Sequence, residues 1–185
     1  MLTRVPSTTN HAMFEALFDR RLRPTGEFAD ELRAAGYDAA RAVPKYPTEL
    51  WVRCLEIARR QRWAALPIDE AYRHIGREFT HGFLETLTGR LVGVAIPFMT
   101  PKTFLRRLAS YMRMGRNDDG LTFDLVNEQS SSVDAQVHNP AGVPGGFVAG
   151  MIDVAMDKLK VSWTITIDQK TPLDYVLHVE WKMRP

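Results

Sequence analysis

The segment LTFDLVNEQSSSVDAQVH, residues 121–138, decides the fold class, because its apolar residues recur at every second position. Apolar and polar residues alternate over residues 121–125, and they do so again over residues 133–138 after a polar stretch. Strict alternation is typical of strands that bury one face and expose the other to water. The two runs therefore predict a β-hairpin.

The residues that follow predict a helix and two further strands. Turn-forming residues over 139–146 precede a stretch, 147–159, in which apolar residues recur at helical spacing. Alternation returns over residues 163–167 and 175–181. The expected C-terminal part is a four-stranded antiparallel sheet with the order β-β-α-β-β, covered on one face.

The preceding two-thirds of the chain is predominantly helical in pattern. The segment from Leu91 to Met99 has no polar face, so we expect it to be surrounded by protein. Thr100 and Pro101 supply an N-cap and a first-turn proline for the last of these helices. We predict an α+β fold, with N-terminal helices packed on the sheet, in one domain over residues 10–185 after a flexible N-terminus at residues 1–9. A first helix is expected to end at about Leu22, a second to run from about Phe28 to Gly36, and a third to span about residues 47–64. A fourth begins at Pro67, bends near Gly82 or Gly89 and ends at Pro97, and the last runs from Pro101 to Gly115.

Composition agrees with one globular domain, since 45% of the 185 residues are hydrophobic and 25% are charged. The single cysteine, Cys54, excludes an intramolecular disulfide and favours a reducing compartment, so we expect a cytoplasmic protein. The N-terminus lacks the pattern of a signal peptide, and no apolar run reaches the ~20 residues that span a bilayer. We expect no membrane partner.

Charge is unevenly distributed along the chain. Residues 1–118 contain 19 basic and 13 acidic residues, whereas residues 119–185 contain 5 basic and 9 acidic residues. A basic region can bind nucleic acid, but here the basic residues are scattered among acids and no nucleic-acid-binding motif accompanies them. We interpret them as solvated helix faces and expect no nucleic-acid partner.

Several strings together carry a family resemblance. They are YPTELW at residues 46–51, EAYRHIGREF at 70–79, TLTGR at 86–90 and TFLRRL at 103–108. With them the chain resembles an uncharacterised domain family, a domain of unknown function, that is expanded in myxobacteria. The resemblance extends over nearly the whole chain and implies no particular activity.

The predicted architecture also resembles, more remotely, the haem-NO-binding and vinyl-reductase-type ligand-binding domains. Those domains enclose a small molecule between their helices and their sheet. The haem sensors' Tyr-x-Ser-x-Arg signature, which holds the haem propionates, is absent from this sequence. The resemblance therefore implies a small-molecule site, and we expect no haem and no other cofactor.

Residues with catalytic or metal-binding chemistry are few. His74 and His81 are seven residues apart on one predicted helix, so their Cα atoms lie roughly 10 Å apart and do not favour a shared metal. Cys54 falls on an apolar stripe, where a thiol is usually inert. No nucleophile elbow, phosphate loop or zinc spacing is present. We expect no metal and no catalytic residues, which favours a protein that is not an enzyme.

Two functions lead from the sequence, with an enzyme of unknown class as a third. The first is a non-catalytic sensory or regulatory domain that binds a small apolar molecule. The alternative is a protein-interaction or homo-oligomerising module, for which the four tryptophans and eight methionines would supply contact surface.

Two locations are candidates for a ligand. Arg73, Arg77 and Arg90 could bind an anion, but surface pairing with Glu70, Glu78 and Glu85 is the plainer interpretation. If a ligand exists, we expect it in a cavity of at least ~300 Å³ between the apolar face of the sheet and the helices, and the favoured alternative is that these side chains simply fill the space. Its predicted lining is Tyr72, Phe79, Phe83, Tyr111, Trp163, Tyr175 and Trp181.

Overall fold

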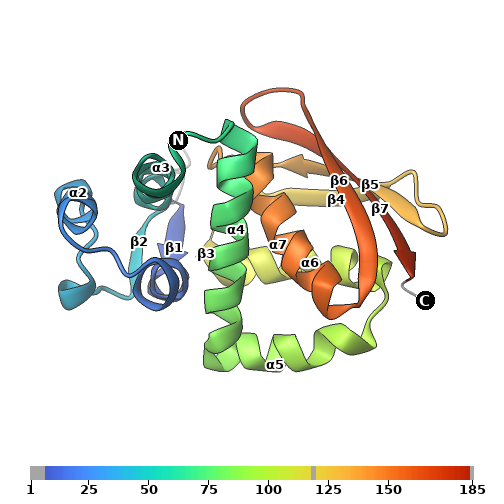
Figure 1. Cartoon of the computed structure of the whole chain (residues 1–185), viewed down its shortest axis with the longest axis horizontal. Helices are drawn as coiled ribbons and strands as arrows, with labels where there is room; N and C mark the ends of the chain where they lie inside the picture. Colours follow the sequence, from blue (N-terminus) through green and yellow to red (C-terminus); the bar gives the residue numbers. More distant parts are fainter. Residues whose placement is uncertain (1–6, 118–119, 184–185) are drawn as a thin grey trace, which may run out of the picture.

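The computed structural model describes residues 7–117 and 120–183. Figure 1 shows the N-terminal helices on one side of the molecule and the larger sheet on the other, with a long central helix between them. A small antiparallel sheet with the strand order β2-β1-β3 joins three segments that are distant in the first two-thirds of the chain. Its strands are β1 (Thr8–Asn10), β2 (Lys45–Pro47) and β3 (Arg116–Asn117).

The strand β1 corrects the expected flexible N-terminus. The sequence assigned residues 1–9 to a flexible segment, but Thr8 and Thr9 pair with strands on both sides of β1. Thr9 is fully buried, and its hydroxyl donates to the Thr48 hydroxyl at 3.2 Å. The remaining residues of that segment, 1–6, lie outside the described residues. Pairing to Tyr46 and Arg116, far along the chain, holds β1 in place, and no local sequence pattern could have indicated it.

The N-terminal helices surround an aromatic cluster. The Phe14 ring lies 4.9 Å from Tyr37, 4.6 Å from Tyr46 and 5.1 Å from Trp51, measured between ring centroids. Gly36 ends the second helix at a φ of 116°, a left-handed conformation that glycine adopts readily. The elements here are α1 (His11–Phe14), the π-helix η1 (Glu15–Leu22), α2 (Glu27–Ala35), the short η2 (Ala39–Arg41) and α3 (Thr48–Trp63).

Two helices from different halves of the chain cross at short range. They are α4 (Ile68–Glu85) and α7 (Gly145–Lys158), and Figure 1 shows them side by side at the centre of the molecule. A Cβ atom at Gly76 would lie 2.0 Å from the Phe147 carbonyl oxygen, and one at Gly150 would lie 2.1 Å from the Arg73 carbonyl oxygen. Glycine is therefore required at these positions for the backbones to approach this closely.

The four-stranded antiparallel sheet confirms the predicted β-β-α-β-β order. Its spatial order is β4-β5-β7-β6. Alternate residues of the second strand, Val133, Ala135 and Val137, are buried, as the period of two predicts. In the register, Ala135 lies opposite Leu177. The strands are β4 (Thr122–Val126), β5 (Ser132–His138), β6 (Val161–Gln169) and β7 (Asp174–Met183).

The apolar segment after α4 differs from the prediction. It forms α5 (Leu87–Ala95) and the short 3-10 helix η3 (Ile96–Phe98) before α6 (Pro101–Met114). Its large side chains were expected to be surrounded by protein, but Leu91, Val94 and Phe98 are exposed. The chain turns at Thr86, so α5 leaves the line of α4, and only one side of α5 packs on the protein. The expectation of burial was wrong.

The start of α6 agrees with the sequence. The Thr100 hydroxyl accepts a hydrogen bond from the Thr103 backbone N–H at 3.2 Å, and Pro101 occupies the first helical position. Phe104 and Leu108 are buried, as their helical spacing predicts. Within the part of the chain that the structure describes, no helix combines the length and apolar character needed to cross a membrane.

Candidate functional site

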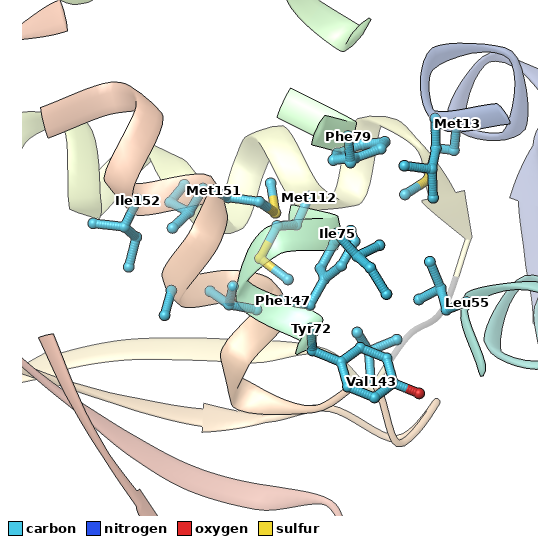
Figure 2. Packing of buried hydrophobic residues seen from close by; sticks show 14 of the residues in the cluster. Met13, Leu55, Tyr72, Ile75, Phe79, Met112, Val143, Phe147, Met151 and Ile152 are labelled. Carbon is cyan, nitrogen blue, oxygen red and sulfur yellow. The ribbon is translucent and has the colours of Figure 1, made fainter. Parts of the chain in front are cut away.

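A small cavity lies beside the crossing of α4 and α7, at the centre of the molecule. Its volume is about 50 Å³. One water needs roughly 10–15 Å³, so the cavity has room for a few atoms of ligand or a few waters. Most of the lining is aromatic or thioether in character, and Figure 2 shows several of these side chains gathered together. The lining residues are Met13, Trp51, Phe79, Phe83, Tyr111, Met112, Gly115, Arg116, Asn139, Val143, Phe147 and Met151.

The polar part of the lining is Arg116 with Asn139. Arg116 follows directly after α6 on strand β3, and Asn139 follows β5, so the end of each element places one of these side chains. Both are buried. The two Arg116 Nη atoms each lie 3.4 Å from the Asn139 Oδ1 atom, and the Asn139 Nδ2 atom donates to the Val143 carbonyl at 3.4 Å. A buried guanidinium that is hydrogen-bonded to Asn139 therefore belongs to the otherwise apolar lining.

Trp51 supplies the second polar feature of the lining. Its side chain is fully buried, and its Nε1–H has no hydrogen-bond partner among the described residues. The ring is held edge-on to Phe79 at 5.8 Å and to Phe147 at 6.1 Å between centroids. A buried donor without an acceptor costs roughly 1–3 kcal/mol, so an acceptor atom placed in the cavity would be stabilised there.

The structure brings together three of the seven residues predicted to line a ligand site. Phe79, Phe83 and Tyr111 line the cavity. Tyr72 lies elsewhere, where its hydroxyl donates to Glu56 Oε2 at 3.1 Å. The expected cavity of at least ~300 Å³ between helices and sheet is not what the structure shows, because that layer is largely filled by packed side chains.

The three remaining predicted residues belong to the packing of the sheet. Trp163 donates its indole N–H to Asp153 Oδ1 at 2.7 Å. Trp181 lies opposite Trp163 in the register of β6 and β7 and is buried. Tyr175 is buried against Gly145, and burial raises the pKa of its hydroxyl. These residues hold α7 and the strands together and do not reach the cavity lining that the structure describes.

The arginines proposed as anion ligands are mostly paired. Arg73 binds Asp153 with two hydrogen bonds of 2.7 Å, and Arg77 lies 3.7 Å from the same carboxylate. Asp153 is only 1% exposed. The expected pairing with glutamates on the same helix is therefore wrong for Arg73 and Arg77, because α7 places a buried acid within their reach. Arg90 is exposed on α5.

The candidate nucleophile and metal ligands do not form a reactive site. Burial raises the pKa of the Cys54 thiol to about 12, so it carries no thiolate at neutral pH. The His74 ring stacks on Trp63, with centroids 6.0 Å apart, and burial lowers the pKa of His81. Across residues 7–117 and 120–183, no cluster of three histidine, cysteine or acidic side chains is arranged to hold a metal ion.

A family model decides the classification. The model described as "Protein of unknown function (DUF2378)" matches residues 3–182. The chain belongs to this family. The predicted resemblance to a domain family of unknown function is thereby confirmed. The match covers nearly the whole chain, as the sequence motifs indicated. A comparison with curated protein sequences found no match.

Solved structures similar to the DUF2378 chain include several H-NOX proteins. The Fe(II) unliganded protein from K. algicida gives a TM-score of 0.70 at 11% identity, over 95% of this chain and 97% of its own. The protein from S. oneidensis in the Fe(II)NO ligation state gives 0.70 at 13%, over 94% and 99%. An oxygen-binding H-NOX domain related to soluble guanylate cyclases, in its oxygen complex, gives 0.61 at 14%, over 93% and 92%. The TM-scores establish a shared fold and confirm the predicted architectural resemblance, and at these identities the likeness extends to the fold alone.

Haem, which that resemblance implies, does not fit the DUF2378 cavity as the structure shows it. The volume of about 50 Å³ is far below the ~300 Å³ at the lower end of typical ligand pockets. None of the described residues that line the cavity is a histidine or a cysteine, the side chains that bind haem iron in globins and in P450s. The Tyr-x-Ser-x-Arg signature is also missing from the sequence.

Sequence reasoning missed the residues that define the cavity. Trp51 reads as one more apolar residue of α3, and Arg116 as one more surface charge. A tryptophan whose N–H lacks a partner cannot be recognised without knowing its surroundings. Met13, Met112 and Met151 come from three separate helices, and only their count in the sequence gave a hint.

Proposed function

We propose that the protein is a non-catalytic sensory or regulatory domain that binds a small molecule in the cavity beside Trp51. The observation that carries this proposal is that Trp51, whose buried N–H lacks an acceptor among the described residues, lines a mainly apolar cavity. A packed core normally satisfies or excludes such a donor. An acceptor atom on a bound ligand would satisfy it.

The lining indicates the chemical class of the ligand. Aromatic rings and thioethers favour an apolar body, and buried Arg116 favours a carbonyl or carboxylate group. The volume of about 50 Å³ restricts an unadapted fit to a very small molecule. Methionine side chains are flexible, however, and Met13, Met112 and Met151 can rearrange to enlarge the space.

The shared fold supports a sensory role by analogy. Of the H-NOX proteins described above, the one from S. oneidensis is in the Fe(II)NO ligation state and the one related to soluble guanylate cyclases is an oxygen complex, whereas the one from K. algicida is unliganded. Fold alone does not fix function, so the analogy contributes only a prior expectation. On this proposal, the ligand is recognised through its own hydrogen-bond acceptor and not through a haem group.

Thermal melts with small probes test the proposal. Isobutyrate and butanone each carry an acceptor on an apolar body, whereas formate carries the acceptor alone. A ligand bound only by the folded state raises the melting temperature in proportion to the logarithm of its concentration once it exceeds Kd. We expect a concentration-dependent rise with isobutyrate or butanone and none with formate.

A pair of matched variants locates the binding. Trp51→Phe removes the donor and keeps an aromatic ring in the cavity, so the affinity should fall about fivefold for the loss of one hydrogen bond worth about 1 kcal/mol. Trp63→Phe changes a tryptophan outside the lining and should bind as the wild type does. The NMR signal of the Trp51 indole proton, assigned from the Trp51→Phe spectrum, should shift on titration. Equal melting shifts in both variants, or an unmoved indole signal, would contradict the proposal.

A further inference from the structure

The helix α5 and the adjoining η3 carry an exposed apolar stripe, defined here as Leu87, Leu91, Val94 and Phe98. These side chains are exposed by 81%, 72%, 69% and 88% respectively. Figure 1 shows α5 along one edge of the molecule. Scattered apolar residues are normal on a surface, whereas a contiguous row of this size marks a contact site.

The opposite side of α5 packs against the rest of the protein. A Cβ at Gly89 would lie 1.7 Å from the Phe83 carbonyl oxygen, and one at Gly93 would lie 3.1 Å from Leu84 Cδ2. The two glycines therefore face the end of α4. Because that contact orients the helix, the apolar stripe points away from the protein.

The spacing of the apolar stripe matches a helix partner. Its members are separated by four, three and four residues, which is the pattern that forms the apolar seam of two packed helices. Arg90 is the only charged residue between Leu87 and Phe98, so little charge opposes the burial of this surface.

We propose that the apolar stripe is a homodimer interface, in which α5 packs antiparallel on α5 of a second copy of this chain. A two-fold axis between Leu91 and Val94 would bring the Leu87 end of one helix to the Phe98 end of the other. Such an interface is self-complementary, since each copy presents the same row. Antiparallel packing also places the positive end of each helix dipole beside the negative end of the other.

The apolar stripe supplies more than half of the area that a stable dimer contact buries on each partner. Four large apolar side chains at these exposures present on the order of 500 Å², in the range of the largest apolar patch on a typical monomer. A stable interface buries roughly 800 Å² on each partner. The exposed neighbours Thr88, Arg90 and Pro97 extend the stripe towards that value as a more polar rim.

Light scattering coupled to size exclusion tests the oligomeric state. We expect the wild-type mass to be twice the chain mass of 21.0 kDa at high concentration and to fall towards it on dilution. Leu91→Glu combined with Val94→Glu should give the monomer mass at every concentration while keeping the wild-type far-UV circular dichroism. Ile68→Glu is the matched control, because Ile68 is 62% exposed on α4 outside the stripe, and it should remain dimeric.

Cross-linking tests the antiparallel arrangement. Cys54 is buried, so a short bismaleimide reports on introduced cysteines. We expect Leu91→Cys to be captured as a dimer, Leu87→Cys alone to remain uncaptured, and a mixture of Leu87→Cys with Phe98→Cys to be captured. Self-capture of Leu87→Cys would overturn the antiparallel arrangement.

Other outcomes would overturn the dimer itself. They are a wild-type chain that stays monomeric at high concentration, or a dimer that survives the double glutamate substitution. A monomer that sediments with phosphatidylglycerol vesicles, and loses that binding in the double variant, would assign the stripe to a membrane surface instead.

Discussion

Two apolar helices of this protein have opposite surroundings. In α7 every residue from Gly145 to Met156 is buried. In α5 the single buried residue is Gly89, although its sequence is almost as apolar. Figure 1 shows the reason, since α7 lies between α4 and the sheet whereas α5 lies at the edge of the molecule. The difference teaches that the apolar content of a helix indicates how much free energy its burial would contribute. It does not indicate which element the helix packs against.

The partner of α7 is determined by features that α5 lacks. Glycines at the crossing let α4 and α7 approach until backbone atoms touch, and Asp153 joins α7 both to Arg73 on α4 and to Trp163 on β6. The glycines of α5 contact only the end of α4. Hydrophobic packing therefore stabilises both helices, but polar anchoring and packing on two sides fix only α7.

Truncating one apolar side chain on each helix should give the largest contrast. Ile152→Ala removes a fully buried side chain of α7 and should destabilise the protein by about 2–5 kcal/mol. Leu91→Ala removes an exposed side chain of α5 and should cost less than about 0.5 kcal/mol in the monomer, as surface substitutions generally do. Urea melts at low protein concentration measure both. Similar losses would show that α5 is covered within the monomer.

Removing the polar anchor of α7 should have the next largest effect. Asp153→Asn leaves Arg73 without its carboxylate partner, and breaking a buried pair costs roughly 3–5 kcal/mol. Arg73 is 35% exposed and can turn to solvent, so we expect about 2–3 kcal/mol. Asp157→Asn, at a half-exposed acid on the same helix, should change the free energy of unfolding by less than about 0.5 kcal/mol. Equal effects of the two substitutions would refute the anchoring role of Asp153.

The sequence predicts the elements of this fold that depend on local periodicity better than those that depend on distant contacts. The strands and their order were predicted correctly, because a period of two specifies a half-buried strand whatever its partner is. The helices α2, α3 and α6 and the start of α4 were also placed within a few residues, whereas the expected continuation of α4 to Pro97 is the separate helix α5. The strand β1 was missed, and α5 was wrongly expected to be buried, because both depend on contacts with distant segments.

The candidate site was predicted less well than the fold. Of the seven predicted residues, Phe79, Phe83 and Tyr111 lie around one space, and their role in ligand binding stays a prediction. Aromatic character does not distinguish them from Tyr72 and Trp163, whose polar atoms are taken up by Glu56 and Asp153. A residue lines a cavity because no other side chain fills the space beside it. No pattern in the sequence records such an unfilled space.

Replacing a helical glycine by alanine should change the free energy of unfolding in opposite directions at the α4–α7 crossing and on α5. Gly76→Ala would place a Cβ 2.0 Å from the Phe147 carbonyl oxygen, so α4 and α7 must move apart at a cost of about 1–3 kcal/mol. Gly93→Ala on α5 meets only a flexible leucine terminus at 3.1 Å and gains helix propensity. It should be neutral or stabilising by up to about 1 kcal/mol. Chemical denaturation of both variants provides the measurement, and destabilisation by Gly93→Ala would indicate that α5 is as tightly packed as α7.

The smallest expected effect concerns local opening of α5. The Thr86 hydroxyl accepts a hydrogen bond from the Gly89 backbone N–H at 3.0 Å and caps the helix. Thr86→Ala should cost about 0.5–1 kcal/mol of helix stability, the lower part of the range for lost N-caps. Because α5 packs on one side only, it can open without unfolding α7. Amide hydrogen exchange should therefore speed up severalfold in α5 and stay unchanged in α7, measured on the monomeric protein.

Thr100→Ala is the control, because it removes the equivalent cap of α6, a helix with a buried face. Its effect should appear in the global free energy of unfolding instead. Faster exchange in α7 after Thr86→Ala would show that the two helices unfold together.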